Sequence, residues 1–139
     1  MFRATKEFKR DMAHRLPSHK GKCFNVHWHT YKCLISIKWE VLNDKWAESW
    51  MLKDFSNFKP MKDWIDENWD HSYVGVEWDE VLDFLKEKGF RVFEMKNNPT
   101  AENMTSFLFR KAKELMWDVE VEKVVVYETP TSFAEFSLT

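Results

Sequence analysis

Residues 31–41 alternate between apolar and mostly polar side chains, and this pattern constrains the fold more than any other part of the sequence. The apolar positions are Tyr31, Cys33, Ile35, Ile37, Trp39 and Val41. A period of two is typical of a β-strand with one buried face. His27 and His29 share the parity of the apolar set, so a strand that extends back to them would direct both imidazoles toward that face.

Four further segments have the pattern or composition of strands. Residues 2–14 place apolar side chains and His14 at even positions, which predicts a second strand with one buried face. Residues 90–95 predict a short strand, residues 119–127 the last long strand, and residues 133–138 a short edge strand.

Helical spacing of apolar residues predicts three helices. The first lies within residues 56–69, and the second spans residues 78–85 and is ended by Gly89. The third begins at Asn98, a good helix cap, with Pro99 in the first helical position. This order of elements predicts an α+β fold, in which helices cover the apolar face of an antiparallel sheet.

Length and composition narrow the class of protein. The 139 residues, 44% of them hydrophobic, are expected to form a single domain over residues 1–139. A net charge of −2 argues against a nucleic-acid partner, and no apolar run is long enough to cross a membrane. Two cysteines form no disulfide framework, so we expect a cytoplasmic protein with free thiols.

Three histidines form the first candidate site. His14 and the pair His27 and His29 would lie on neighbouring strands and face inward. Neutral imidazole is the usual nitrogen ligand of zinc, and three protein ligands with an open fourth position are typical of a catalytic site. The alternative is two structural histidines near a strand end and an unrelated third, and we favour the metal site. His19, in a polar loop, is expected to be solvated.

A second group of candidates could move protons. Cys23 precedes the histidine pair, and a nearby cation would lower the pKa of its thiol and suit it to act as a base or nucleophile. The alternative is a small buried hydrophobic residue, a description that fits Cys33 better. Asp70 beside His71 can orient the imidazole or share a proton relay, although a surface loop is the more common explanation.

Two carboxylates are candidates for ligand binding. Glu102 falls near the start of the third helix, where interaction with the helix dipole is its default role. Glu128 ends the apolar run of residues 124–127. It either leaves the sheet for solvent or lies in a pocket, and the sequence leaves these alternatives open.

Six short motifs follow one another along the chain. They are Ala13-His14-Arg15-Leu16, Cys23 with His27-Trp28-His29, Lys53-Asp54-Phe55, Asp70-His71, Pro99-Thr100-Ala101-Glu102-Asn103 and Glu128-Thr129. In this order, from residue 13 to residue 129, the chain resembles the 6-pyruvoyltetrahydropterin synthase family. Each motif alone is short, but six in order are specific.

The resemblance implies a role for each candidate. Zinc would be bound by three ligands, namely His14, His27 and His29. Cys23 would act as general base or proton shuttle, with Asp70 and His71 as its relay. The pterin ring would be anchored by Glu128, because a carboxylate accepts two parallel hydrogen bonds. Further contacts to the pterin would come from Glu102 and Thr100.

The family also implies a fold and a reaction. The fold would be the tunnelling fold (T-fold), a four-stranded antiparallel sheet with helices on one face, whose subunits assemble into a barrel, usually a hexamer built as a dimer of trimers. The expected enzyme is a lyase that converts 7,8-dihydroneopterin triphosphate to 6-carboxy-5,6,7,8-tetrahydropterin in queuosine synthesis. The alternatives are a 6-pyruvoyltetrahydropterin synthase and a non-catalytic zinc- or pterin-binding module.

The sequence departs from the family pattern at several points. Trp28 replaces the usual Gly between the two histidines, and we expect its side chain to point to the opposite face of the strand. Val74-Gly75 stand where many members have Leu-Asn, and Trp50-Met51-Leu52 replace a Gly-Met-Val type of segment. Cys23 argues against the folate-bypass subtype, in which a Glu occupies that position.

Overall fold

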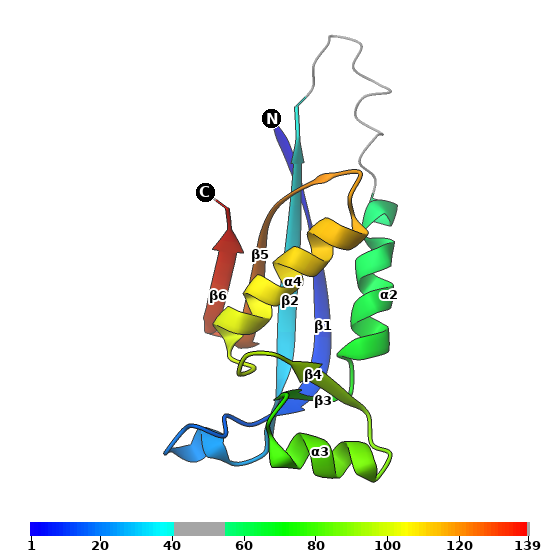
Figure 1. Cartoon of the computed structure of the whole chain (residues 1–139). Coiled ribbons are helices and arrows are strands. Elements are labelled where there is room, and N and C mark those ends of the chain that lie inside the picture. Colours follow the sequence, from blue (N-terminus) through cyan, green and yellow to red (C-terminus); the bar gives the residue numbers. More distant parts are fainter. Residues whose placement is uncertain (41–54, 139) are drawn as a thin grey trace.

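The structure, a computed structural model, describes residues 1–40 and 55–138 and shows an α+β fold (Figure 1). Its strands are β1 (Phe2–His14), β2 (His27–Trp39), β3 (Tyr73–Val76), β4 (Val92–Met95), β5 (Glu120–Thr129) and β6 (Ser132–Ser137). Its α-helices are α2 (Lys59–Asn68), α3 (Glu80–Glu87) and α4 (Ala101–Leu115). The predicted Val41 and the segments Trp50-Met51-Leu52 and Lys53-Asp54 lie outside the described residues.

The two longest strands form the centre of the sheet. β1 and β2 pair antiparallel over their whole length, from Phe2 opposite Trp39 to His14 opposite His27. Their alternating apolar residues lie on one face, which α2 and α4 cover (Figure 1). The large side chains at the centre of this interface are fully buried and include Tyr31, Ile35, Met61, Ile65, Trp69 and Leu108. The predicted buried face of both strands is therefore confirmed.

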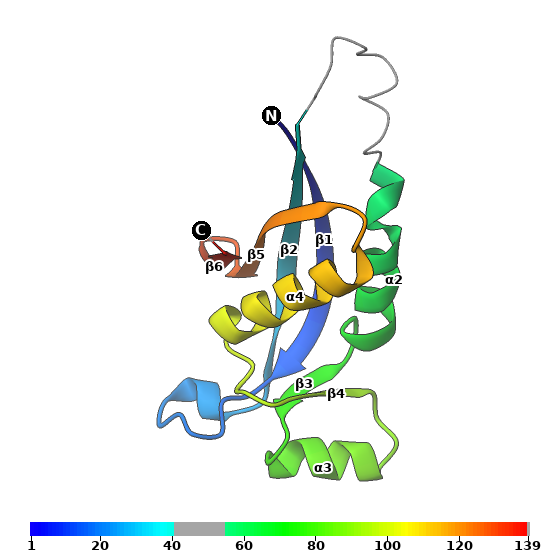
Figure 2. The same ribbon diagram turned by 45° about the horizontal axis from the view of Figure 1, so that its top comes forward.

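The prediction of a four-stranded, purely antiparallel sheet is wrong. The described residues form a six-stranded mixed sheet in the order β4-β3-β1-β2-β5-β6, in which β3 runs parallel to β1 and to β4. β3 was missed because all four of its residues are buried, so the segment has no alternation. Figure 2 shows β3, β4 and α3 together at one end of the long strands.

The ends of two helices test the capping predictions. Gly89 follows α3 with φ +83°, the left-handed conformation expected after a helix C-terminus, so this prediction is confirmed. The predicted start of α4 is wrong, since Thr100 rather than Asn98 is the cap and its hydroxyl accepts a hydrogen bond from the Asn103 amide at 3.2 Å. Pro99 stays outside the helix, and its carbonyl is used elsewhere.

None of the helices in residues 1–40 and 55–138 is long and apolar enough to span a membrane.

Candidate functional site

Three imidazoles meet at the end of the β1–β2 ladder. His14 lies directly opposite His27, and His29 follows two residues later on the same face of β2. The Nε2 atoms of His14 and His27 are 3.0 Å apart, and the ligand atoms of all three rings lie within 4.8 Å of one another. The cluster that the alternating pattern predicted is therefore formed, and it could hold a metal ion.

Main-chain carbonyls determine how two of these rings are oriented. His14 Nδ1 lies 2.8 Å from the Pro99 carbonyl, and His27 Nδ1 lies 2.8 Å from the Asn25 carbonyl. A carbonyl only accepts, so each Nδ1 carries the proton and each Nε2 keeps its lone pair. This is how metal-bound histidines are held in proteins, with the second ring nitrogen donating to an acceptor.

The third imidazole, His29, lies beside a carboxylate but forms no hydrogen bond through Nε2 within the described residues. This Nε2 is buried, and Glu128 Oε1 approaches it to 3.4 Å. A buried polar atom without a partner is unfavourable. A cation between the rings would satisfy His29 and also remove the repulsion between the lone pairs of His14 and His27. The three residues therefore fit a divalent metal such as zinc.

Burial keeps the cluster in the form that binds metal. The pKa of His14 falls to about 4, chiefly because its ring is buried; the hydrogen bond to Pro99 opposes this shift, and His27 and His29 reinforce it. Burial also lowers the pKa of His29, although the charge of Glu128 raises it in part. Both rings are consequently neutral near neutral pH, as metal ligation requires.

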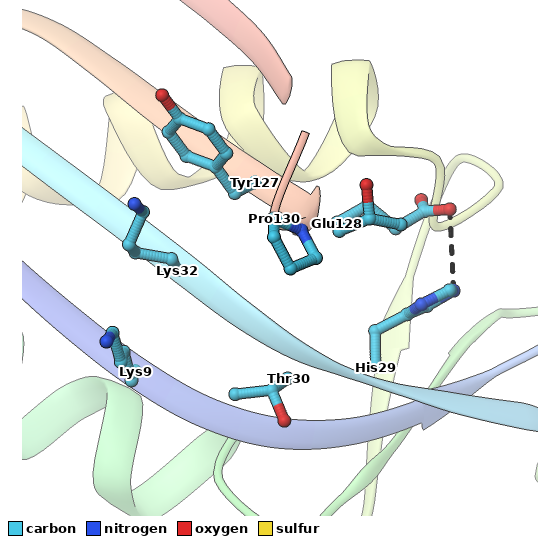
Figure 3. A pocket seen from close by; sticks show the side chains of 8 residues that line it. Lys9, His29, Thr30, Lys32, Tyr127, Glu128 and Pro130 are labelled. Carbon is cyan, nitrogen blue, oxygen red and sulfur yellow. Dashed lines mark ion pairs between the residues drawn. The ribbon is translucent and has the colours of Figure 1, made fainter. Parts of the chain in front are cut away.

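Glu128 connects the histidines to a pocket. It lies at the end of β5, and with His29 it lines a cavity of about 420 Å³. Figure 3 shows Lys9 and Lys32 on the opposite side of this cavity from the His29–Glu128 pair. The alternative that the sequence left open is thereby decided, because Glu128 lies in a pocket rather than in free solvent.

The position of Cys23 is set by a short turn. It lies in the single-turn 3₁₀ helix Lys22–Phe24 and is partly buried, and its carbonyl accepts a hydrogen bond of 2.7 Å from the Leu16 amide. Cys33, by contrast, is buried inside the sheet, and burial raises the pKa of its thiol to about 12. Cys33 is thus the inert hydrophobic residue that its place in the strand predicted.

Asp70 and His71 form the predicted pair but lie at a different surface. His71 Nδ1 is 3.0 Å from Asp70 Oδ1, and His71 adopts a left-handed backbone with φ +58°. Its ring lines a separate cavity of about 360 Å³ that neither Cys23 nor any histidine of the cluster lines. Within the described residues, the cavity that His71 lines is therefore not one that Cys23 shares.

The remaining predicted contacts lie at the start of α4. The Thr100 hydroxyl caps the helix, and Glu102 is exposed in its first turn, where the helix dipole favours a carboxylate. They follow Pro99 in the chain, whose carbonyl accepts the hydrogen bond from His14 Nδ1.

Comparison with known proteins shows which family shares the sequence pattern of this chain. The family model described as 6-pyruvoyl tetrahydropterin synthase matches residues 3–138. The chain belongs to this family. A curated protein of Haemophilus influenzae, named 6-carboxy-5,6,7,8-tetrahydropterin synthase, is 34% identical to this chain over 98% of this chain and 99% of its own length. The prediction of an enzyme of this family is confirmed.

Solved structures confirm the fold. A protein of Wolinella succinogenes described as uncharacterized has a TM-score of 0.82 at 20% identity, covering 99% of this chain and 98% of its own. The 6-pyruvoyl tetrahydropterin synthase of Caenorhabditis elegans has a TM-score of 0.72 at 24% identity, covering 99% and 96%. The T-fold expected from the family resemblance is therefore present, although its sheet has six strands in the described residues.

The main departure from the family's motif is accommodated by the strand. Trp28 lies between two candidate ligands but on the opposite face of β2, where it is 77% exposed and lines the cavity that holds His71. The prediction that this bulky side chain leaves the histidine cluster intact is confirmed.

Sequence reasoning missed two pairs of charged residues, one that lines the cavity and one beside the turn of residues 22–24. Lys9 and Lys32 are directly opposed in the β1–β2 ladder and both line the cavity. Each lysine occupies a polar position of an alternating strand, so the sequence indicated that both would lie away from the apolar face. Only the register of the two strands shows that the lysines are opposite one another. Arg15 and Asp79 are the other pair, and both are buried.

Proposed function

We propose that the chain is a zinc-dependent lyase that converts 7,8-dihydroneopterin triphosphate to 6-carboxy-5,6,7,8-tetrahydropterin, with release of acetaldehyde and triphosphate, in 7-deazaguanine (queuosine or preQ0) synthesis. The observation that carries the proposal is the position of Glu128, 3.4 Å from a histidine of the metal-binding cluster and within the same cavity. The names of the curated relatives support the choice of product.

The metal would be held by His14, His27 and His29, with its fourth position open to substrate. When bound, zinc would supply Lewis-acid polarisation to the two hydroxyls of the substrate side chain and make the adjacent C–H more acidic. The chain's own contribution is to keep the ligands neutral and correctly oriented, through burial and through the carbonyls of Pro99 and Asn25.

Glu128 would bind the pterin ring. An ionised carboxylate accepts hydrogen bonds from the amino group and the ring N–H of a pterin in parallel, which fixes the ring in one orientation. Because the carboxylate also lies beside His29, the ring's side chain would extend toward the metal. We include Thr100 and Glu102, at the start of α4, among the proposed substrate contacts.

The two lysines suit the triphosphate. Like charges directly opposite each other on neighbouring strands are destabilising, so the Lys9–Lys32 pair has a cost that an anionic ligand would offset. Lys32 is partly compensated by Glu7 at 3.7 Å and by the ring of Tyr127 at 4.2 Å. Lys9 forms no ion pair within residues 1–40 and 55–138 and is available to a phosphate group.

Cys23 would act as the general base or proton shuttle at the substrate side chain, with Asp70 and His71 as its relay. Because Cys23 does not line the cavity that His71 lines, we propose that the relay comes from a second copy. This arrangement agrees with assembly of single-domain subunits, each spanning residues 1–139, into a hexameric barrel built as a dimer of trimers. The two free thiols suit a cytoplasmic location.

Two alternatives remain distinct in outcome. A 6-pyruvoyltetrahydropterin synthase would use the same substrate but only eliminate triphosphate and rearrange, and the name of the Caenorhabditis elegans structure favours it. A non-catalytic zinc- or pterin-binding module would bind without turnover. The deciding experiment is mass spectrometry of the products formed from 7,8-dihydroneopterin triphosphate by zinc-loaded protein. A 6-carboxy product supports the proposal, and a 6-pyruvoyl product supports the alternative enzyme. Unchanged substrate contradicts both enzymes and supports the non-catalytic module.

A further inference from the structure

A buried ion pair lies just beyond the histidine cluster. Arg15 Nη1 donates to Asp79 Oδ1 at 3.0 Å, and the two residues are only 6% and 1% exposed. Asp79 also caps α3 by accepting from the Val81 amide at 3.0 Å, and it accepts a hydrogen bond of 2.5 Å from the Tyr73 hydroxyl. Both carboxylate oxygens of Asp79 are therefore satisfied, and its position is determined by β3 and α3 together.

Arg15 also binds the turn that contains Cys23. Arg15 Nε donates to the Phe24 carbonyl at 3.1 Å, and the guanidinium lies over the Phe24 ring, 4.6 Å from its centroid. The neighbouring Leu16 amide donates to the Cys23 carbonyl at 2.7 Å. The turn is thus held at two successive carbonyls, by two residues that directly follow the candidate metal ligand His14.

The pair is costly, and the packing around it is close. Removing two charges from water carries a large desolvation penalty, and a hydrophobic pair of similar size would often be as stable. Asp79 caps α3 by itself, so the N-cap does not explain why Arg15 is paired with it. Gly75 leaves the necessary room, since a Cβ at that position would lie 2.9 Å from Tyr73 Cε1 and 3.3 Å from Asp79 Oδ2. Arg15 donates to Asp79 through Nη1 and to the Phe24 carbonyl through Nε, and a pair without a guanidinium would lose one of these two hydrogen bonds.

We propose that Arg15 and Asp79 are positioning residues that hold the Cys23 turn at a set place relative to the metal ligand His14. Asp79 anchors the guanidinium to β3 and α3, and the guanidinium in turn anchors the Phe24 carbonyl. The catalytic part of this inference rests on the function proposed above for Cys23, whereas the restraint on the turn does not.

The test uses the zinc-loaded 139-residue chain with two variants, Arg15→Lys and Phe24→Ala. Lysine keeps a charge near Asp79 but has no second nitrogen for the Phe24 carbonyl. Phe24→Ala removes only a ring that is 47% exposed, so this variant is expected to fold. The matched control is Leu82→Ala, which loosens the packing of α3 without changing either residue of the ion pair.

The first readout is the rate of alkylation of Cys23 by iodoacetamide, followed by peptide mass spectrometry, with buried Cys33 as the internal reference. We expect both variants to react roughly tenfold faster, because the turn opens more often. We also expect kcat to fall by about tenfold or more, with KM and zinc content nearly unchanged. Displacement of the Cys23 thiol would slow the chemical step without weakening substrate binding.

Three results would overturn the inference. Unchanged alkylation in both variants would show that Arg15 does not restrain the turn, and equal changes in Leu82→Ala would show only general loosening. Faster alkylation with unchanged kcat would reduce the pair to a structural role. Alkylation needs no turnover, so a wild-type protein that fails to convert the pterin substrate contradicts the proposed function and leaves the restraint on Cys23 testable.

Discussion

His14 Nε2 and His27 Nε2 face each other at 3.0 Å, while the Nδ1 atoms of both rings are turned toward main-chain carbonyls. Two neutral imidazoles in this arrangement present two lone pairs to the same point. A cation at that point would relieve the repulsion between them, and the Nε2 of His29, which has no hydrogen-bond partner within the described residues, borders it.

Removing one imidazole should therefore release the metal. We expect His29→Ala to weaken zinc binding by more than about 100-fold, because the loss of a direct ligand exceeds the 10–100-fold effect of losing a supporting group. Zinc content after dialysis against a chelator of known affinity measures this effect. His19→Ala is the control, since His19 is exposed and its ring accepts a hydrogen bond from the Gly21 amide. Equal zinc retention in both variants would remove His29 from the ligand set.

Glu128→Gln should separate pterin binding from metal binding. The amide keeps the shape but cannot accept two parallel hydrogen bonds, so we expect the dissociation constant of a pterin to rise by roughly 100-fold. Zinc content should not fall, because Glu128 lies outside the cluster. Titration calorimetry with a pterin checks this, with Glu120→Gln on the same strand as control. An unchanged affinity in Glu128→Gln would show that the ring binds elsewhere.

The lysine pair should act on the phosphates and not on the ring. In Lys9→Gln/Lys32→Gln we expect about a tenfold loss of affinity for inorganic triphosphate, with the affinity for an unphosphorylated pterin preserved. Stability should rise by about a few tenths of a kcal/mol, since two opposed like charges are removed. The control is Lys38→Gln, whose ammonium pairs with Glu120 outside the cavity. Equal losses in the double variant and the control would indicate only a general charge effect.

The stability of the metal-free protein should fall as the pH falls. The pKa of His14 is about 4 in the folded chain, against an ordinary value of 6.5, so below pH 6.5 the unfolded chain binds a proton that the folded chain does not. The contribution of His14 is complete above pH 6.5, and it is lost progressively toward pH 4. At about pH 5.5 the loss should be on the order of 1 kcal/mol. Urea denaturation in the presence of a chelator measures it, and His14→Gln should show a smaller dependence on pH over this interval.

Complementation can test whether the relay crosses between copies. Cys23→Ala and His71→Ala should each be inactive alone. If the thiol and the relay come from different chains, an equal mixture that is unfolded and reassembled should recover about a quarter of wild-type activity, the share of sites that random pairing makes complete. An inactive mixture that still forms oligomers would place both groups in one chain.

The sequence determined the parts of this protein that depend on local periodicity. Alternation in residues 2–14 and 31–41 indicated two strands with one buried face, and the parity of His14, His27 and His29 put all three imidazoles on it. This works because successive side chains of a strand point to opposite faces whatever the strand pairs with. The order of six motifs was likewise enough to indicate the family.

Only the tertiary structure decided which groups meet. The Pro99 carbonyl that orients His14 is 85 residues away in the chain, and the Asp79 carboxylate that holds Arg15 is 64 residues away. The parallel strand β3, the opposition of Lys9 and Lys32, and the separation of His71 from the histidine cluster likewise follow from pairing and packing. Local patterns predict which face of a strand or helix is buried. Which residues of distant segments become neighbours depends on the register between those segments, and no short-range pattern encodes that register.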